Sequence, residues 1–154
     1  RLVRDWSSDV CSSDLNSAIH HYQKQLPSNY NFTLTSLEAQ NRKTNNIDNI
    51  KTLEGNMLLE AAKGSTTLIA FDELGKQQSS RMIAKSMETW QLHGDNVALI
   101  IGGADGLSSE LKQQCHYIWG LSNLTMTHSI ARLLVIEQLY RAHTLLTNHP
   151  YHRE

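Results

Sequence analysis

The last seven residues, NHPYHRE, carry an unusual density of side chains that can do chemistry. Tyr151 can stack on a base, Arg153 can hold a phosphate, and His149 or His152 can move a proton. Chain ends usually lack such groups because they fray. Two histidines without a third ligand nearby do not make a zinc site, which needs three or four. The tail therefore favours a nucleotide over a metal.

A glycine-rich turn, IIGGADGL, offers a second place for a ligand. Gly102 and Gly103 follow an apolar run, and Gly106 stands at the start of a short helix. Glycine allows a ligand to approach the main chain closely, and a nucleotide-like cofactor fits such a turn. The order G-G-x-x-G is not a dinucleotide fingerprint, because no suitable acidic residue follows about twenty residues later. A plain strand-to-helix turn is the alternative interpretation.

A third segment, LSNLTMTH at 121–128, mixes hydroxyl and apolar side chains. Its backbone groups could meet a heterocycle while Leu121, Leu124 and Met126 supply apolar walls. Capping of the next helix by Thr127 or Ser129 explains much of the same pattern.

The final helix places Arg132, Glu137 and Arg141 among apolar residues. Glu137 and Arg141 stand four apart, which favours a helix ion pair worth about 0.3–0.5 kcal/mol. Arg132 and Arg141 are candidates for phosphate contacts, because a guanidinium matches phosphate with two parallel hydrogen bonds.

Strands that alternate with helices must position these groups. Apolar periodicity predicts helices and strands in alternation; the helices are 16–26, 47–62, 79–93, 107–115 and 130–146, and the strands 31–37, 67–71 and 96–101, followed by a mixed segment at 117–126. This alternation predicts a parallel α/β sheet covered on both faces. Ligands bind beyond the carboxyl ends of such strands, which indicates 71–72, 102–106 and 121–127.

Composition is consistent with one globular domain. The chain has 154 residues, 40% hydrophobic and 19% charged, with a net charge of −1. This balance argues against nucleic-acid binding driven by bulk charge. No apolar stretch approaches the ~18 residues of a membrane helix, and two cysteines, Cys11 and Cys115, fit a reducing cytoplasm.

The first fifteen residues, RLVRDWSSDVCSSDL, differ from the rest. They are rich in Ser and Asp, contain the near-repeat SSDV and SSDL, and show no sustained period. We interpret residues 1–15 as a foreign or poorly structured segment before a single domain at 16–154. A short strand at Leu2–Val3 is the alternative.

Three segments together carry a family resemblance: IIGGADGL, LSNLTMTH and ARLLVIEQLYRAHTLLTNHPYHRE. They resemble the RNA methyltransferase H family of the bacterial large ribosomal subunit, a branch of the knotted SPOUT superfamily. The similarity runs from about Asn16 to Glu154 and is densest from Phe71 onward.

The resemblance implies an α/β/α domain with a parallel sheet and a deep C-terminal trefoil knot, an exception to unthreaded topology. It implies S-adenosyl-L-methionine as cofactor and the assembled ribosome as substrate. The reaction would methylate N3 of a pseudouridine in 23S ribosomal RNA. A cytoplasmic homodimer, with an RNA site built from both protomers and no metal, is implied as well.

Carried over to this chain, the resemblance assigns cofactor binding to the strand ends and the loop, namely Phe71, Gly102, Gly103, Leu121, Ser122, Asn123, Leu124, Thr125 and Met126. We assign catalysis to Arg153, His152 and Tyr151, with His128 as a candidate base, and RNA binding to Arg132, Arg141 and His149.

The chain departs from the family at Thr127, where the family usually has proline, at Phe71, where it usually has leucine, and over 1–15. If the altered N-terminus disables the site, a non-catalytic α/β dimer that docks on the ribosome is the alternative. A nucleotide hydrolase is a weaker rival, because the adjacent Cys115 and His116 supply no facing nucleophile and base.

Overall fold

The structure is a computed structural model that describes residues 2–3, 12–38, 40–41, 43, 46–103 and 105–152. Of residues 2, 3, 12 and 13 it describes only the backbone. In chain order the elements are β1 (Leu2–Val3), α1 (Ser12–Gln25), a 3-10 turn (Ser28–Tyr30), β2 (Leu34–Thr35), α2 (Ile47–Ala61), β3 (Thr67–Gln77), α3 (Ser80–His93), β4 (Val97–Ile101), α4 (Ser109–Gln114), β5 (Tyr117–Gly120) and α5 (His128–Leu146).

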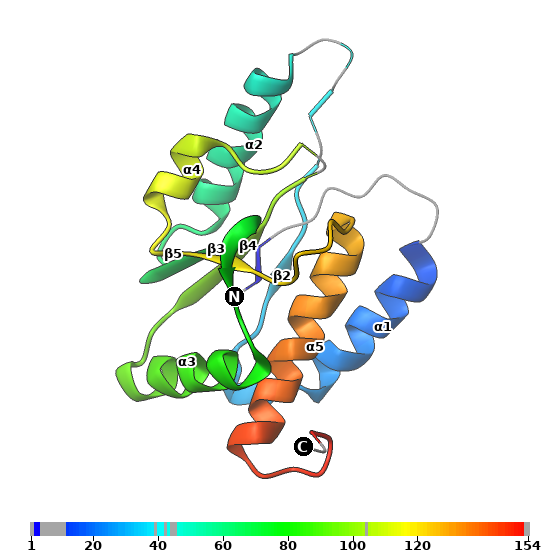
Figure 1. Cartoon of the computed structure of the whole chain (residues 1–154), viewed down its shortest axis with the longest axis vertical. Coiled ribbons are helices and arrows are strands. Elements are labelled where there is room, and N and C mark those ends of the chain that lie inside the picture. Colours follow the sequence, from blue (N-terminus) through cyan, green and yellow to red (C-terminus); the bar gives the residue numbers. More distant parts are fainter. Residues whose placement is uncertain are drawn as a thin grey trace.

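The strands form one parallel sheet in the order β2-β1-β4-β3-β5. β3 lies between β4 and β5, so the connection from β4 to β5 crosses over β3. Helices α2 and α4 lie on one side of the sheet, and α1, α3 and α5 on the other (Figure 1). This architecture confirms the predicted parallel α/β/α class, while the trefoil knot stays a prediction.

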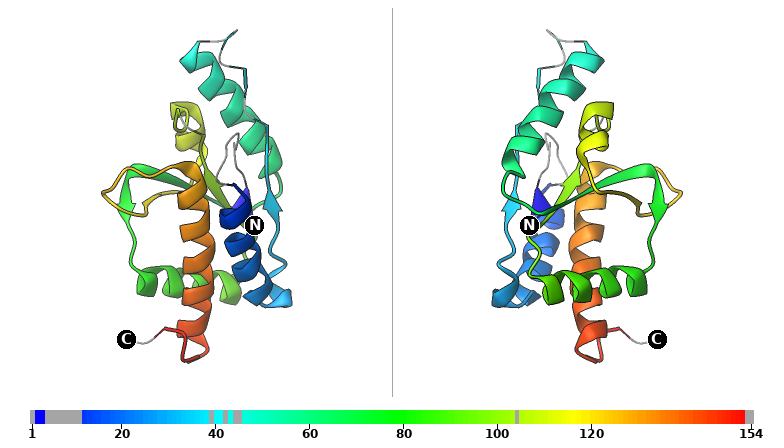
Figure 2. Two further views of the ribbon diagram at one scale, coloured as in Figure 1. Left: turned by 90° about the vertical axis from the view of Figure 1, so that its right-hand side faces the viewer. Right: turned by 90° about the vertical axis from the view of Figure 1, so that its left-hand side faces the viewer.

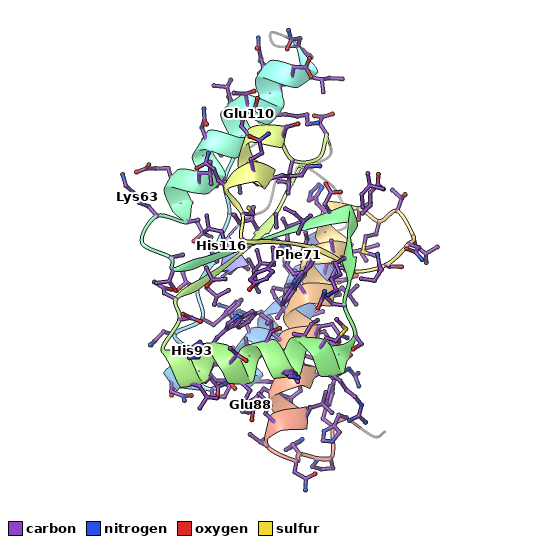
Figure 3. The ribbon with its side chains drawn as sticks, turned by 60° about the vertical axis from the view of Figure 1, so that its left-hand side comes forward. Lys63, Phe71, Glu88, His93, Glu110 and His116 are labelled. Carbon is purple, nitrogen blue, oxygen red and sulfur yellow. The ribbon has the colours of Figure 1, made fainter. Side chains whose placement is uncertain are left out.

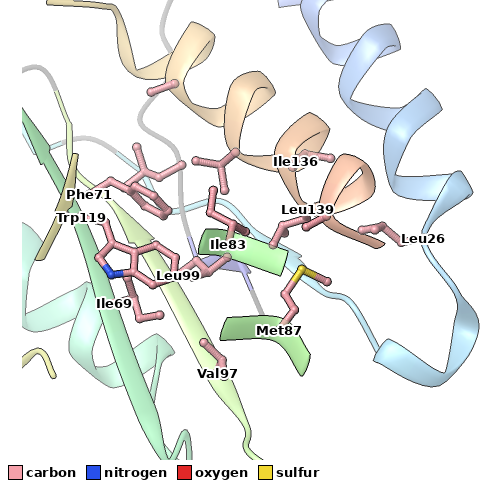
Figure 4. Packing of buried hydrophobic residues seen from close by; sticks show 14 of the residues in the cluster. Leu26, Ile69, Phe71, Ile83, Met87, Val97, Leu99, Trp119, Ile136 and Leu139 are labelled. Atoms are coloured by element: carbon pink, nitrogen blue, oxygen red, sulfur yellow. The ribbon is translucent and has the colours of Figure 1, made fainter. Parts of the chain in front are cut away.

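Alternation along the strands divides the core into two. In β4 the side chains of Val97, Leu99 and Ile101 pack among residues of α3 and α5, as Figure 4 shows for that cluster. Ala98 and Ile100 point the other way and pack with residues of α2 and α4. All five side chains are buried, because a central parallel strand has a helix layer on each face.

Helix ends follow the capping residues in the sequence. Ser79 accepts a hydrogen bond from the backbone N–H of Met82 at the start of α3, and Gly94 ends that helix in a left-handed conformation. Thr127 caps α5 in the same way through the N–H of Ile130. The capping interpretation of Thr127 is thus confirmed.

The N-terminal part departs from the expectation for 1–15. Leu2–Val3 form a strand that pairs with β2 on one side and β4 on the other, which is the alternative interpretation. Helix α1 begins at Ser12 rather than near Asn16. Residues 4–11 lie outside the described part of the chain, so the foreign origin of the segment stays a prediction.

Two strands differ in length from their predicted bounds. β3 continues to Gln77, because its second half pairs with β5, and such long-range pairing is invisible in a sequence window. β2 covers only Leu34–Thr35 of the predicted run 31–37. None of the helices in the described ranges is long and apolar enough to span a bilayer.

Candidate functional site

A cavity of about 330 Å³ lies beyond the ends of β4 and β5 and beside the middle of β3. Its walls come from the middle of β3, from the segments after β4 and β5 and from the first turn of α5; the lining residues are Phe71, Asp72, Glu73, Ile101, Gly102, Gly103, Asp105, Gly106, Leu107, Leu121, Ser122, Leu124, Thr125, Met126, His128 and Ala131. The three segments predicted from the strand ends therefore meet at one edge of the sheet.

The pairing register places these parts of the three strands side by side. Phe71 of β3 pairs with Ile101 of β4 on one side and with Trp119 of β5 on the other. The Phe71 and Trp119 rings meet edge to face with centroids 6.2 Å apart. Phe71 lies between the sheet and α5 (Figures 3 and 4), where it forms the floor of the cavity.

Two glycines keep β3 and β5 together beyond Phe71. The pairing shifts register between Phe71 and Lys76, so that Trp119 is opposite both. A Cβ on Gly75 would lie 2.5 Å from the Trp119 carbonyl carbon, and one on Gly120 would lie 2.7 Å from the Gly75 oxygen. Only glycine permits this backbone contact. The contact sets the direction in which the second half of β3 and the 121–127 loop project together from the rest of the sheet (Figure 2).

The 121–127 loop is fastened at three points. Ser122 accepts a hydrogen bond from the Leu124 N–H at 3.0 Å, and Thr125 donates to the Glu73 carboxylate at 3.3 Å. Thr127 then caps α5. These contacts hold the loop without the proline expected at position 127.

Carboxylates give the cavity wall a negative character. Asp72, Glu73 and Asp105 all line it. Asp72 pairs with Lys112 of α4 at 2.9 Å and accepts the Leu74 N–H at 2.9 Å. Burial raises the pKa of Asp72, but these hydrogen bonds and the charges of Lys112 and Lys51 outweigh it, and the net pKa is below its usual range. Asp72 is therefore ionised at neutral pH.

The residues present suit a cationic nucleoside. Apolar side chains of Phe71, Leu121 and Met126 face backbone groups of Gly102 and Gly103 across a cavity of small-molecule size. A Cβ on Gly102 would lie 2.8 Å from the Leu107 side chain, so this strand end admits only glycine without rearrangement. The acidic wall favours a positive charge such as a sulfonium. Of the predicted cofactor residues, only Asn123 is absent from the lining; it is exposed.

The C-terminal tail folds back onto α5. Asn148, in a left-handed conformation, reverses the chain, and the His149 N–H donates to the Thr144 carbonyl. The Tyr151 hydroxyl then lies 3.0 Å from the Glu137 carboxylate and 3.2 Å from the Tyr22 hydroxyl. Burial and these two hydrogen bonds raise the pKa of Tyr151, so it stays a neutral donor. Residues 148–151 of the tail are thus held by contacts.

Glu137 is the centre of this cluster. Its carboxylate accepts two hydrogen bonds from Arg141, at 2.8 and 3.1 Å, and one from Gln138. Arg141 also lies over the Tyr151 ring, 5.0 Å from its centroid. The predicted ion pair between Glu137 and Arg141 is confirmed. The phosphate-binding role of Arg141 stays a prediction.

The tail and the cavity lie along different parts of α5. His128 begins the helix and lines the cavity, whereas Glu137, which holds Tyr151, stands nine residues later, roughly 13 Å along the axis. Neither Tyr151 nor His152 lines the cavity. Arg153 lies outside the described residues. One chain therefore does not bring Tyr151 or His152 to the predicted cofactor residues.

The residues predicted to contact RNA differ in their exposure to solvent. His149 is exposed. Arg132 is buried, with 6% of its surface accessible, and donates to the Asn16 side chain of α1 at 2.8 Å. The structure gives Arg132 a packing role between α1 and α5, and its exposure does not support the RNA-binding prediction.

Sequence reasoning missed two sets of residues. Glu73 and Asp105 line the cavity, and their position beside two strand ends was the available signal. Tyr22 reaches the tail from α1, 129 residues away in sequence, and no local pattern signals such a pairing. The described residues contain no group of three or more His, Cys, Asp or Glu side chains that could hold a metal.

Comparison with known families identifies the class of this domain. The family described as "Predicted SPOUT methyltransferase" matches residues 9–152. The chain therefore belongs to the SPOUT methyltransferase family, and the match covers the cavity, the helix that carries the tail and every strand of the sheet except β1.

Within that class the relatives are more particular. A protein of Teredinibacter turnerae named ribosomal RNA large subunit methyltransferase H is 45% identical over 136 residues, 86% of each chain. Its namesake in Methylobacillus flagellatus is 36% identical over 151 residues, covering 97% of this chain and 92% of the relative. The chain belongs to the ribosomal RNA large subunit methyltransferase H family, as its tail and loop motifs predicted.

A solved structure supports the fold. The structure of a probable methylase family protein from Haemophilus influenzae Rd KW20 aligns with a TM-score of 0.59 at 13% identity, over 99% of this chain and 69% of that one. At this identity the likeness concerns the fold alone.

Proposed function

We propose that this chain is a ribosomal RNA methyltransferase that uses S-adenosyl-L-methionine to methylate N3 of a pseudouridine in 23S ribosomal RNA. The observation that carries the proposal is the cavity beside the middle of β3 and the ends of β4 and β5, with apolar, main-chain and acidic walls in a chain of this family. The finer assignment of base and position comes from the motif resemblance.

When bound, S-adenosyl-L-methionine supplies a methyl group on a sulfonium as the electrophile. The protein's part is binding and orientation. Leu121 and Met126 would line the site of the heterocycle, Gly102 and Gly103 would let it approach the main chain, and the carboxylates of the cavity wall would favour its positive charge.

The acceptor nitrogen requires a base or a stabilising cation. N3 of the uracil-type ring is weakly acidic, and loss of its proton creates the nucleophile. We assign the cation to Arg153, with His152 and Tyr151 positioning the ring. His128 lies at the cavity and is the candidate base. Asn123, Ser122 and Thr125 complete the cofactor loop.

A homodimer would complete this site. Tyr151 and His152 of one protomer do not line its own cavity, so a second copy would be needed to bring them to the cofactor. Large apolar side chains are exposed beside the cavity: Leu74 is 89% accessible and Leu124 is 76%. The Glu73–Thr125 hydrogen bond ties their two segments together, which suits an interface.

The ribosome, in the cytoplasm, is the expected partner. With a net charge of −1, the chain lacks the excess of positive charge that tight nonspecific binding to free RNA requires. Recognition would depend on the shape of the assembled ribosomal surface, and Arg141 and His149 are the proposed phosphate contacts.

Methyl transfer to whole ribosomes tests the proposal. The full chain should label intact ribosomal particles from radiolabelled cofactor and label naked 23S RNA poorly. Arg153→Ala should abolish the transfer and leave cofactor affinity near normal. Cofactor binding without transfer by the unaltered chain contradicts the methyltransferase proposal, and transfer that survives Arg153→Ala contradicts the tail assignment. Absence of cofactor binding favours the non-catalytic docking dimer.

A further inference from the structure

A second cavity, larger than the first, lies near the opposite ends of the strands, where β4 begins. Its volume is about 620 Å³, and its described lining residues are Leu26, Asn29, Tyr30, Asn31, Phe32, Met87, Trp90, Gln91, Gly94, Asp95, Asn96, Val97, Leu99 and Leu139. It opens where β4 begins, whereas the cofactor cavity lies beyond the end of β4 at Ile101, roughly 13 Å along the strand. The methyl-transfer chemistry proposed above does not use it.

Three aromatic side chains come to this cavity from two parts of the chain. Tyr30 and Phe32 belong to the connection between α1 and β2, and Trp90 belongs to the last turns of α3. All three are half-buried and pack against the core, and one face of the Trp90 ring is stacked on Trp119 with 6.0 Å between centroids. Aromatic faces at the edge of a cavity are the usual platforms for planar rings.

A hydrogen-bonded chain fixes one wall. The Tyr30 hydroxyl accepts from the Gln91 side-chain amide at 2.9 Å and is paired with His143 Nδ1 at 2.8 Å. The Tyr30 and His143 rings meet edge to face, 5.3 Å between centroids. Burial lowers the pKa of His143, as does the nearby His149, so a neutral imidazole faces the tyrosine. The wall is therefore preorganised and uncharged.

The lining defines the charge of its ligand. Among the described lining residues, amides are the main polar groups, from Asn29, Asn31, Gln91 and Asn96, and the charged one is Asp95. Amides both donate and accept hydrogen bonds, as the edge of a nucleobase does. Because the described lining includes neither Lys nor Arg, the cavity does not suit a phosphate or carboxylate group.

We propose that this second cavity binds a neutral planar nucleobase, stacked on Trp90 and Phe32 and hydrogen-bonded by the amides around Gln91. The base could be presented by a free nucleoside or by an unpaired nucleotide of RNA. The inference stands apart from the methyltransferase proposal, because it uses none of the residues of the cofactor cavity.

Fluorine NMR of the full chain labelled with 5-fluorotryptophan reports on the cavity directly. Signals of Trp6, Trp90 and Trp119 are assigned by single Trp→Phe variants. Adenosine, cytidine, guanosine and uridine are titrated one at a time, then short single-stranded oligoribonucleotides, all with the cofactor cavity saturated by S-adenosylhomocysteine. Ribose serves as the ligand without a base. We expect a saturable shift at Trp90 with at least one base-bearing ligand.

Two variants separate stacking from hydrogen bonding. Phe32→Leu keeps the apolar volume but removes the ring, and should weaken binding about tenfold. Gln91→Ala changes an exposed side chain, so it should leave the fold intact and weaken binding less. Tyr117→Leu, a matched aromatic-to-leucine change at a 55% exposed side chain outside both cavities, should leave the Trp90 titration unchanged.

Each outcome decides the inference. Shifts with nucleosides indicate a small ligand, and shifts with oligonucleotides alone indicate RNA; both support a base site. No shift at Trp90, a shift that ribose reproduces, or affinity unaltered in both Phe32→Leu and Gln91→Ala overturns it. A shift that appears only without S-adenosylhomocysteine also overturns it, because the base then binds in the cofactor cavity. The titration of S-adenosylhomocysteine itself tests the methyltransferase proposal separately.

Discussion

At the scale of single residues, Glu137 links the last helix to the tail. It accepts hydrogen bonds from Arg141, Gln138 and Tyr151, so one carboxylate fixes the position from which the following residues extend. A hydrogen bond to a charged group contributes more than a neutral one, about 1.5–3 kcal/mol. The placement of His152 therefore depends on Tyr151.

Tyr151→Phe tests this dependence. Loss of the hydroxyl removes the bonds to Glu137 and Tyr22, and we expect methyl transfer to ribosomes to fall about tenfold with cofactor affinity unchanged. Tyr117→Phe is the control, because Tyr117 is 55% exposed and should behave as the unaltered chain. Equal activity of Tyr151→Phe and Tyr117→Phe would show that the tail is positioned by other means.

The pH dependence of the reactivity of the Cys115 thiol tests whether this side chain is buried in the fold. Burial raises the pKa of the Cys115 thiol to about 11, from an ordinary 9.0. Because the thiolate is the reactive form, alkylation at pH 8 should be far slower than for a free thiol, and its rate should rise until about pH 11. Peptide-resolved mass spectrometry separates Cys115 from Cys11. A rate that levels off near pH 9 would contradict the burial.

At the scale of elements, the junction of β3 and β5 shapes the cofactor cavity. Gly75 and Gly120 allow the two backbones to touch, and the segments beyond them form two of the cavity walls. This junction influences the shape of the cavity more than single residues of the 121–127 loop do, because it fixes the point at which that loop begins.

Gly120→Ala should break that junction. Its Cβ would lie 2.7 Å from the Gly75 oxygen, so we expect a loss of about 1–3 kcal/mol in the free energy of unfolding and loss of cofactor binding. Gly64→Ala is the control: Gly64 has a φ of +86° but open space around it, so it should cost about 1 kcal/mol and leave cofactor binding intact. Chemical denaturation and calorimetry measure both. Intact binding in Gly120→Ala would disprove the role of the junction.

Sequence patterns predicted those parts of the fold that depend on near neighbours. Ser79 and Gly94 give the ends of α3, and the apolar run at 97–101 gives β4. The register shift opposite Trp119 and the extension of β3 to Gln77 depend on a strand more than forty residues away, so local patterns could not give them. Leu2–Val3 become a strand only because β2 and β4 lie on either side.

The candidate site was predictable to a similar degree. The rule that ligands bind at strand ends located the three segments of the cavity, and Phe71, Gly102 and Leu121 line it together. Arg132 was assigned to RNA because a guanidinium matches a phosphate with two hydrogen bonds, but the structure buries Arg132, which donates to Asn16. The partnership of Tyr151 with Tyr22 required the tertiary structure.

At the scale of the whole molecule, one protomer separates the two halves of the proposed active site. The cavity lies at the start of α5 and the tail packs beside its later turns. A dimer that uses the exposed apolar side chains beside the cavity would unite them.

Leu74→Glu tests this arrangement. Leu74 is 89% exposed on the projecting part of β3, and a charge there should weaken a dimer and reduce methyl transfer. Leu92→Glu is the matched control, because Leu92 is 79% exposed near the end of α3 and should leave the assembly unchanged. Analytical ultracentrifugation measures both. A monomeric unaltered chain that still methylates ribosomes would contradict the shared site.

The central claim is that the cavity at three strand ends binds S-adenosyl-L-methionine, and calorimetric titration of the full chain tests it most directly. We predict saturable binding at one site per chain. It should be lost in Gly102→Val, whose Cβ would meet Leu107 within 2.8 Å, and kept in Tyr151→Phe. Absence of binding to the unaltered chain, or undiminished affinity in Gly102→Val, would contradict the account.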